Sequence, residues 1–215
     1  IPDLGLFEAL AKRLNKPLII DGAATFGTPG IQQFGDAFCV SFHATKSFPV
    51  GECGAVVCSR DVADRVREYI NFGFDNDRVS MGPGLNAKVS EYTCAIALAL
   101  LDEINGPLEA RKRNAAQLKR LLGMKNSLSS STGDDTVYQA YTVFTSSPQE
   151  AQYCHKMLQG LDIETKAYYR PLIPMRHSSL LYDTSICLPV HDKVTGEDIY
   201  KMAWTLQRAL IAPID

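Results

Sequence analysis

The chain has 215 residues, of which 46% are hydrophobic, and its 22 basic and 24 acidic residues give a formal charge of −2. This length is enough for one large domain or for two small ones. The near-neutral charge provides no strong field for nucleic acid or an anionic membrane, so we expect neither as a partner.

The first half of the chain alternates helical and strand patterns. Asp3 is placed to cap a first helix, whose apolar stripe has helical spacing: Leu6, Phe7, Leu10 and Leu14. Three short apolar runs predict buried strands, over residues 17–21, 37–42 and 54–58, and the first of them is of the parallel-sheet kind. A helix is expected over residues 61–70 and a glycine-bearing loop over residues 75–88. This order of elements is typical of an α/β sheet enzyme.

The second half begins with a long apolar helix, expected over residues 90–104 and continuing after Gly106-Pro107 to Leu122. The Gly-Pro pair predicts a domain boundary, with residues 1–105 on one side and 106–215 on the other. Beyond a loop at 125–136, three strands are expected, over residues 137–144, 166–169 and 185–188. Two helices are expected as well, one over 148–158 and one after a capping box of Thr195 and Asp198. This mixture predicts a small α+β domain.

The cysteines favour a reduced compartment. None of the six belongs to a C-x-x-C pair, and most lie in apolar runs, so we expect buried thiols and neither a disulfide framework nor a metal site. No apolar run approaches membrane-spanning length, and no signal peptide is visible. A cytoplasmic protein is the simplest inference.

Lys46 and Asp21 are the side chains that most suggest catalysis. Lys46 follows the strand expected at 37–42, which makes it a candidate amine for a Schiff base with an aldehyde cofactor. Asp21 ends the preceding strand, where a carboxylate could pair with a pyridinium nitrogen. Together they predict pyridoxal phosphate chemistry. The ordinary alternatives are a surface lysine and a turn aspartate, and His43 could equally line the pocket or be structural.

Several segments, in order, resemble the DegT/DnrJ/StrS family of sugar aminotransferases. Those that carry the resemblance are Asp21-Gly-Ala-Ala-Thr-Phe-Gly27, Gly35-Asp-Ala-Phe-Cys-Val-Ser-Phe-His-Ala-Thr-Lys46, Gly51-Glu-Cys-Gly-Ala-Val-Val57, Gly84-Leu-Asn-Ala-Lys88, Tyr168-Tyr169-x-Pro171 and Leu188-Pro189-x-His191. No single segment is specific, but the ordered set covers nearly the whole chain. The resemblance implies a pyridoxal-phosphate-dependent transferase of fold type I. Residues 1–105 would be the later part of the large α/β/α domain, and residues 106–215 the small α+β domain.

The resemblance also implies roles for individual residues. Lys46 would form the Schiff base and move the proton between the substrate and cofactor carbons. Asp21 would pair with the pyridine nitrogen, Ser41 would bind the phosphate, and Asn86 would reach the phosphate of the partner subunit in a homodimer. At Ala24, part of the cofactor-binding segment, the family commonly has Gln or His that contacts the cofactor, so here this contact is absent or comes from elsewhere.

The implied reaction transfers an amino group to a nucleotide-linked keto sugar, with glutamate as the usual donor. Its product would be an amino sugar for a surface glycan or a secondary metabolite. The sequence differs from the family pattern at Lys88 as well, where the family has an arginine. Lysine keeps the positive charge but lacks the planar guanidinium group and its paired N–H donors.

Members of this family carry substantial sequence before the first helix expected here, including a phosphate-binding turn and an aromatic residue that stacks on the cofactor. We therefore expect a C-terminal portion of a longer enzyme, which by itself binds the cofactor weakly or not at all. The main alternative is a truncated, cofactor-free fragment or a non-catalytic scaffold. A dehydratase of the family is disfavoured because Lys46 would be histidine. Another fold-type-I enzyme, such as a cysteine desulfurase, is disfavoured by Asn86 and Tyr169-x-Pro171.

Overall fold

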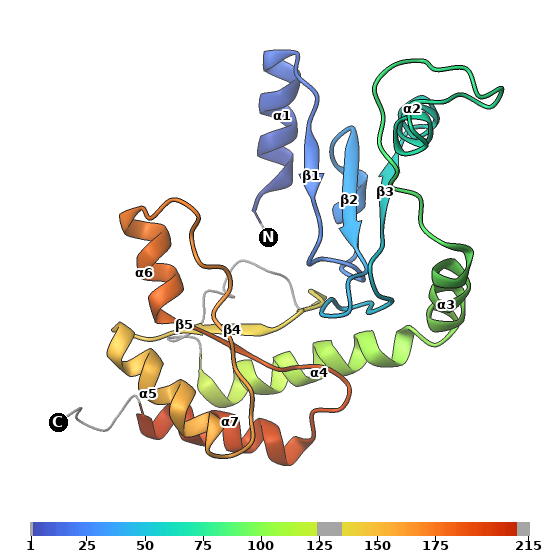
Figure 1. The fold of residues 1–215 in the computed structure, drawn as a ribbon. Coiled ribbons are helices and arrows are strands. Elements are labelled where there is room, and N and C mark those ends of the chain that lie inside the picture. Colours follow the sequence, from blue (N-terminus) through green and yellow to red (C-terminus); the bar gives the residue numbers. More distant parts are fainter. Residues whose placement is uncertain (1, 124–134, 210–215) are drawn as a thin grey trace. The chain divides into compact units, whose positions relative to one another are not determined.

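A computed structural model describes residues 2–123 and 135–209 (Figure 1). The chain divides into two compact units, Ile1–Asn105 and Gly106–Asp215. Most of the loop predicted at 125–136 lies outside the described residues. Within the described part, no helix is long and apolar enough to cross a membrane.

The first unit is built on a three-stranded sheet, drawn as blue and cyan arrows in Figure 1. Its strands are β1 (Ile19–Asp21), β2 (Ala37–Ser41) and β3 (Gly54–Cys58), in that spatial order. β1 pairs with β2 in parallel, as predicted. β3 runs antiparallel to β2, with Ser41 opposite Gly54 and Ala37 opposite Cys58.

Three helices of the first unit begin where their sequences predict. In α1 (Leu4–Leu14) the Asp3 carboxylate accepts a hydrogen bond from the Leu6 N–H at 3.3 Å, and Asn15 ends the helix in the left-handed conformation. In α3 (Glu91–Asp102) the Ser90 hydroxyl accepts from the Thr93 N–H. The remaining helices are α2 (Arg60–Ile70) and a short 3₁₀ turn, η1 (Ile31–Gln33).

The prediction that all three strands are buried was wrong for two of them. Ile19 in β1 is 67% exposed and Val57 in β3 is 47% exposed, whereas Ala37 and Phe38 in β2 are buried. β1 and β3 are the outer strands of this sheet, so each has a neighbouring strand on one side only. An apolar run shows which side chains favour burial. Whether they are buried depends on which residues, far away in the sequence, pack against them.

The second unit has a continuous apolar core between helices and a two-stranded sheet. Its elements are α4 (Asn105–Leu122), β4 (Tyr141–Phe144), α5 (Pro148–Gln159), α6 (Arg176–Thr184), β5 (Ser185–Leu188) and α7 (Gly196–Ala209). β4 and β5 pair antiparallel, with Tyr141 opposite Leu188. The core includes the fully buried Leu118, Leu158 and Met202, which come from three of the helices.

Two polar side chains of α4 form hydrogen bonds with backbone carbonyls of the neighbouring loops. The buried Arg111 donates to the carbonyl oxygens of Tyr138 and Gln139 at 3.3 and 3.0 Å. Asn114 donates to the carbonyl oxygen of His191 at 3.0 Å. Because buried carbonyls are costly without partners, both side chains are structural residues of the second unit.

Three details of the second unit differ from the sequence predictions. β4 is shorter than residues 137–144, and residues 166–169 form only an isolated pairing of Lys166 with Cys187. α6 was not predicted, because its preceding residue, Met175, offers no capping side chain. Gly106-Pro107 lies in the first turn of α4 and does not separate two helices, as expected of a proline near a helix start.

Candidate functional site

The predicted catalytic residues follow two neighbouring parallel strands. Because β1 and β2 are parallel, their carboxyl ends lie at the same end of the sheet. Asp21 is the last residue of β1 and Ser41 the last of β2. Asp21 pairs with Cys39, which is two residues before Ser41, so the side chains of Asp21 and Ser41 project from the same face.

The turn after β1 fixes the Asp21 carboxylate. Its Oδ1 atom accepts a hydrogen bond from the Ala23 N–H at 3.0 Å, and the Gly22 N–H donates to the Cys39 carbonyl oxygen at 2.7 Å. A Cβ atom at Gly22 would collide with the Phe38 ring, so any larger residue there requires this buried ring to move. Asp21 forms no ion pair among the described residues, which leaves this exposed carboxylate accessible to a cationic group.

Lys46 lies in the turn after β2. Its backbone N–H donates to the His43 carbonyl oxygen at 2.9 Å, and its side chain is half-buried. The next residue, Ser47, is 1% exposed, and its hydroxyl donates to the Phe26 carbonyl oxygen at 3.0 Å. This bond joins the loop that carries the amine to the loop that follows Asp21.

An aromatic cluster packs these two loops together. Phe26 comes from the loop after β1, whereas Phe42 and Phe48 flank the turn after β2. The Phe26 and Phe48 rings stack with centroids 4.9 Å apart, and Phe42 contacts both edge-on at 5.5 and 5.1 Å. Sequence reasoning missed this cluster and the anchoring role of Ser47, although Phe26 and Phe42 lie inside the quoted motifs and Phe48 is two residues beyond Lys46.

His43 braces the turn that carries Lys46. Its Nδ1 atom lies 2.9 Å from the Thr45 hydroxyl and accepts the Thr45 backbone N–H at 3.3 Å. Its Nε2 atom lies 3.3 Å from the Glu52 carboxylate. An Nδ1 atom that accepts a backbone N–H leaves the ring proton on Nε2, facing Glu52. Of the two roles that the sequence left open for His43, these contacts favour the structural one.

The other two predicted residues contribute differently. Ala24 is exposed in the turn after Asp21, and its methyl side chain has no polar atom to offer a ligand. Asn86 lies on the segment between α2 and α3, where it pairs with Asn71. Nearby, the Lys88 ammonium donates to the Asn71 side-chain oxygen at 3.1 Å and lies 4.2 Å from the Phe72 ring centroid. The structure thus groups Asp21, Ser41 and Lys46 on adjoining loops and places Asn86 on another segment.

The grouped residues match the chemistry of pyridoxal phosphate. They offer an amine for an aldehyde, a carboxylate for a protonated ring nitrogen and a hydroxyl for a phosphate oxygen. The Ser41 hydroxyl accepts the His43 N–H at 3.3 Å, which orients it at the end of β2. Among the described residues, no group of three or more metal-ligating side chains occurs. These residues therefore fit an organic phosphate cofactor.

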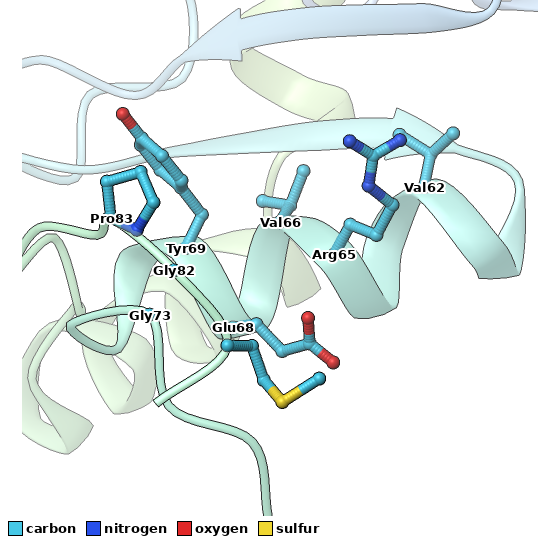
Figure 2. A pocket seen from close by; sticks show the side chains of 9 residues that line it. Val62, Arg65, Val66, Glu68, Tyr69, Gly73, Gly82 and Pro83 are labelled. Carbon is cyan, nitrogen blue, oxygen red and sulfur yellow. The ribbon is translucent and has the colours of Figure 1, made fainter. Parts of the chain in front are cut away.

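A separate pocket of about 550 Å³ lies between α2 and the segment that follows it (Figure 2). Its lining residues are Val62, Arg65, Val66, Glu68, Tyr69, Gly73, Met81, Gly82 and Pro83. Figure 2 shows the Tyr69 ring beside Pro83 and the Val66 side chain directed into the same space. None of the predicted site residues lines this pocket, so it is distinct from the group around Lys46.

Comparison with known proteins identifies related sequences along most of the chain. A sequence model of the DegT/DnrJ/EryC1/StrS aminotransferase family matches residues 1–207. Protein Rv3402c of Mycobacterium tuberculosis is 30% identical over 97% of this chain and 56% of its own length. The dTDP-4-amino-4,6-dideoxy-D-glucose transaminase of Shigella dysenteriae is 24% identical over 92% of this chain and 60% of its own length. The chain therefore spans somewhat more than half the length of these relatives.

A solved structure confirms the predicted fold. NtdA of Bacillus subtilis, crystallised with bound cofactor PMP, superimposes with a TM-score of 0.86 at 16% identity, covering 98% of this chain and 54% of NtdA. At this level of identity the likeness establishes the fold alone. The prediction of part of a type-I transferase fold is thereby confirmed.

Proposed function

This chain belongs to the DegT/DnrJ/EryC1/StrS aminotransferase family, and on that premise we propose that it acts in a pyridoxal-phosphate-dependent sugar aminotransferase. The observation that carries the proposal is the grouping of Asp21, Ser41 and Lys46 on the adjoining loops after two parallel strands. Members of the family use pyridoxal phosphate, and PMP, the cofactor in NtdA, is its aminated form.

Each of the three side chains has a distinct task. When bound, the cofactor supplies an electron sink for the carbanion formed at the substrate carbon. Lys46 would hold the cofactor at its aldehyde carbon through Nζ, and its free amine would accept and return a proton at Nζ. Asp21 would stabilise a proton on the ring nitrogen, since its carboxylate forms no ion pair among the described residues. Ser41 orients the phosphate through its hydroxyl.

The substrate in this proposal is a nucleotide-linked keto sugar, and glutamate is the amino donor. The name of the Shigella relative supports the sugar class, since that enzyme is a transaminase of a dTDP-linked amino sugar. The product would be an amino sugar for a surface glycan or a secondary metabolite. The cytoplasm is the proposed location, supported by six free cysteines, three of them half-buried and two buried.

A homodimer with shared active sites completes the proposal. The segment that carries Asn86 exposes several large apolar side chains, namely Phe72, Val79, Met81, Leu85 and Val89. Large apolar side chains exposed close together along one segment favour a protein–protein interface there. Asn86 would then reach the cofactor phosphate bound to the second subunit, which is consistent with its place on a segment apart from Lys46.

The comparisons favour this reading over a cofactor-free fragment or scaffold, because the matched relatives include a named transaminase. A dehydratase of the family is disfavoured by the lysine at position 46. The full activity is a property of the whole enzyme, and the chain covers 56% and 60% of the two curated relatives.

Reductive trapping tests the proposal directly. The whole enzyme that contains this chain is incubated with pyridoxal phosphate and sodium borohydride, and the modified peptide is identified by mass spectrometry. We expect modification at Lys46 and its loss in Lys46→Ala, with Lys193→Ala, an exposed lysine of the second unit, as the matched control. Addition of dTDP-4-amino-4,6-dideoxy-D-glucose should discharge the visible absorbance of the loaded protein. Trapping at other lysines with Lys46 unmodified would refute the assignment.

A further inference from the structure

The backbone of His43 is bonded to both of the proposed site residues that follow the strand β2. Its N–H donates to the Ser41 hydroxyl at 3.3 Å, and its carbonyl oxygen accepts the Lys46 N–H at 2.9 Å. A change in the backbone conformation at His43 would therefore move the hydroxyl proposed to bind the phosphate and the amine proposed to bind the aldehyde together.

The His43 ring supports this conformation in one tautomer only. Its Nδ1 atom accepts the Thr45 backbone N–H at 3.3 Å and lies 2.9 Å from the Thr45 hydroxyl. An imidazole nitrogen that carries a proton has no lone pair left for an N–H donor, so this bond requires Nδ1 to be unprotonated. The turn that leads from Thr45 into Lys46 thus depends on the tautomer whose ring proton lies on Nε2.

The Glu52 carboxylate favours that tautomer. Its Oε1 atom lies 3.3 Å from Nε2 of His43, and this is the one ion pair in which Glu52 takes part among the described residues. A carboxylate accepts a hydrogen bond from a protonated Nε2, but it repels the lone pair that Nε2 carries in the other tautomer. The proton of His43 is therefore held on the side of the ring away from Thr45.

The loop that carries Glu52 is bonded to the residue before His43. The N–H groups of Val50 and Gly51 both donate to the Phe42 carbonyl oxygen, at 2.8 and 3.0 Å, which keeps the backbone of this loop beside the turn. The Glu52 side chain is 90% exposed, and exposed ion pairs contribute little to folding stability. The consequence of this pair is the choice of tautomer at His43, and its contribution to stability is minor.

We propose that Glu52 is a positioning residue of the aminotransferase site, and that it acts through His43. Glu52 keeps the His43 proton on Nε2, and the unprotonated Nδ1 then holds the Thr45 N–H. The closed turn presents the Lys46 amine and the Ser41 hydroxyl to the cofactor in a fixed relation. This inference rests on the proposed function and adds to it a regulation of the same site by two residues outside the catalytic group.

The rate of reductive trapping at Lys46 in the whole enzyme measures this effect. At about pH 8, where an ordinary imidazole is neutral, Glu52→Gln should slow the modification about tenfold, because an amide both donates and accepts and pairs with either tautomer. Thermal unfolding should stay close to that of the wild type. Glu197→Gln is the matched control, since Glu197 is 76% exposed and paired with Lys201, and it should be modified at the wild-type rate.

His43→Asn separates an effect through His43 from a direct effect of Glu52. The asparagine oxygen can accept the Thr45 N–H in place of Nδ1, and an amide has no tautomer to select. This variant should keep most of the wild-type rate, and Glu52→Gln added to it should cause no further loss. His43→Leu, which offers no acceptor, should be about tenfold slower. The proposal is overturned if Glu52→Gln has no effect, or has the same effect with histidine and with asparagine at position 43.

A second readout does not involve the cofactor. NMR of ¹⁵N-labelled histidine reports which ring nitrogen carries the proton, and the loss of signals in His43→Asn identifies His43 among the four histidines of the chain. We expect the proton on Nε2 in the wild type and a mixture of tautomers in Glu52→Gln. A proton on Nδ1 in the wild type would overturn this proposal alone. A wild type that is not modified at Lys46 would refute the aminotransferase assignment, and this proposal with it.

Discussion

The Ser47 hydroxyl donates to the Phe26 carbonyl oxygen at 3.0 Å, and this bond connects the loop of Lys46 to the loop that follows Asp21. Ser47 is buried, so Ser47→Ala would leave the Phe26 carbonyl without its partner. We expect a loss of about 1–3 kcal/mol in the unfolding free energy of the first unit. Urea denaturation measures it, with Ser80→Ala, at an exposed position, as the control. An unchanged midpoint for Ser47→Ala would show that the two loops are held by their phenylalanines alone.

Asp21→Asn tests the proposed role of the carboxylate. Asparagine preserves the size of the side chain and can still accept the Ala23 N–H, but it cannot neutralise a protonated ring nitrogen. We expect kcat/KM of the whole enzyme to fall about 10²- to 10³-fold, the range seen when one preorganised electrostatic contact is removed. Thermal unfolding should stay close to that of the wild type. Retention of most of the activity would remove Asp21 from the catalytic group.

Arg111→Ala should destabilise the second unit strongly. The substitution leaves the carbonyl oxygens of Tyr138 and Gln139 without the donor they now share. Burial also lowers the pKa of the Arg111 guanidinium, and the nearby Asp192 charge opposes this effect. A loss of about 3 kcal/mol is expected. Arg113→Ala, at an exposed position on the same helix, should change little, and equal effects of the two substitutions would contradict this account.

Acid should destabilise the second unit through His191. Burial, and then the nearby Arg111 charge, lower the pKa of His191 below its ordinary value of 6.5. Because the pKa of His191 is lower in the folded chain, the folded state favours the neutral imidazole. As the pH falls below 6.5, the unfolded chain therefore binds more protons than the folded chain. Stability therefore declines from about pH 6.5 until the folded pKa is passed, and is flat below it.

The check compares urea midpoints of wild type and His191→Gln from neutral pH to about pH 5. The wild type should lose more stability than the variant over this range. His177→Gln, at an exposed position on α6, should behave like the wild type. Parallel curves for wild type and His191→Gln would assign the acid sensitivity to other groups.

Local signals in the sequence predicted the elements that have local causes. Asp3 and the pair Thr195 and Asp198 cap their helices as expected, and in the second case the Asp198 carboxylate accepts both the N–H and the hydroxyl of Thr195. The existence of the three strands and the placement of Asp21 and Ser41 at strand ends also followed from the sequence. These features depend on a few neighbouring residues, which the sequence displays directly.

Features set by distant residues were missed or misjudged. The burial of Ile19 and Val57 depends on which residues pack against the outer strands. The local sequence pattern does not contain this information. The bond from Ser47 to Phe26 spans 21 residues and depends on the two strands being paired. The buried hydroxyl of Thr205, which has no hydrogen-bond partner among the described residues, is equally invisible in sequence, because a threonine within a helix looks the same whether or not its side chain is bonded.

The reversal of β3 has a practical consequence for labelling. Cys58 pairs with Ala37, so the chain enters α2 at the end of the strands opposite Ser41, about 13 Å away at 3.3 Å per residue. Ser59 is exposed and makes no capping bond with its side chain, so a fluorophore attached through that side chain would remove no hydrogen bond of the helix cap. Position 59 is thus an attachment point from which the loop of Lys46 can be monitored without being touched.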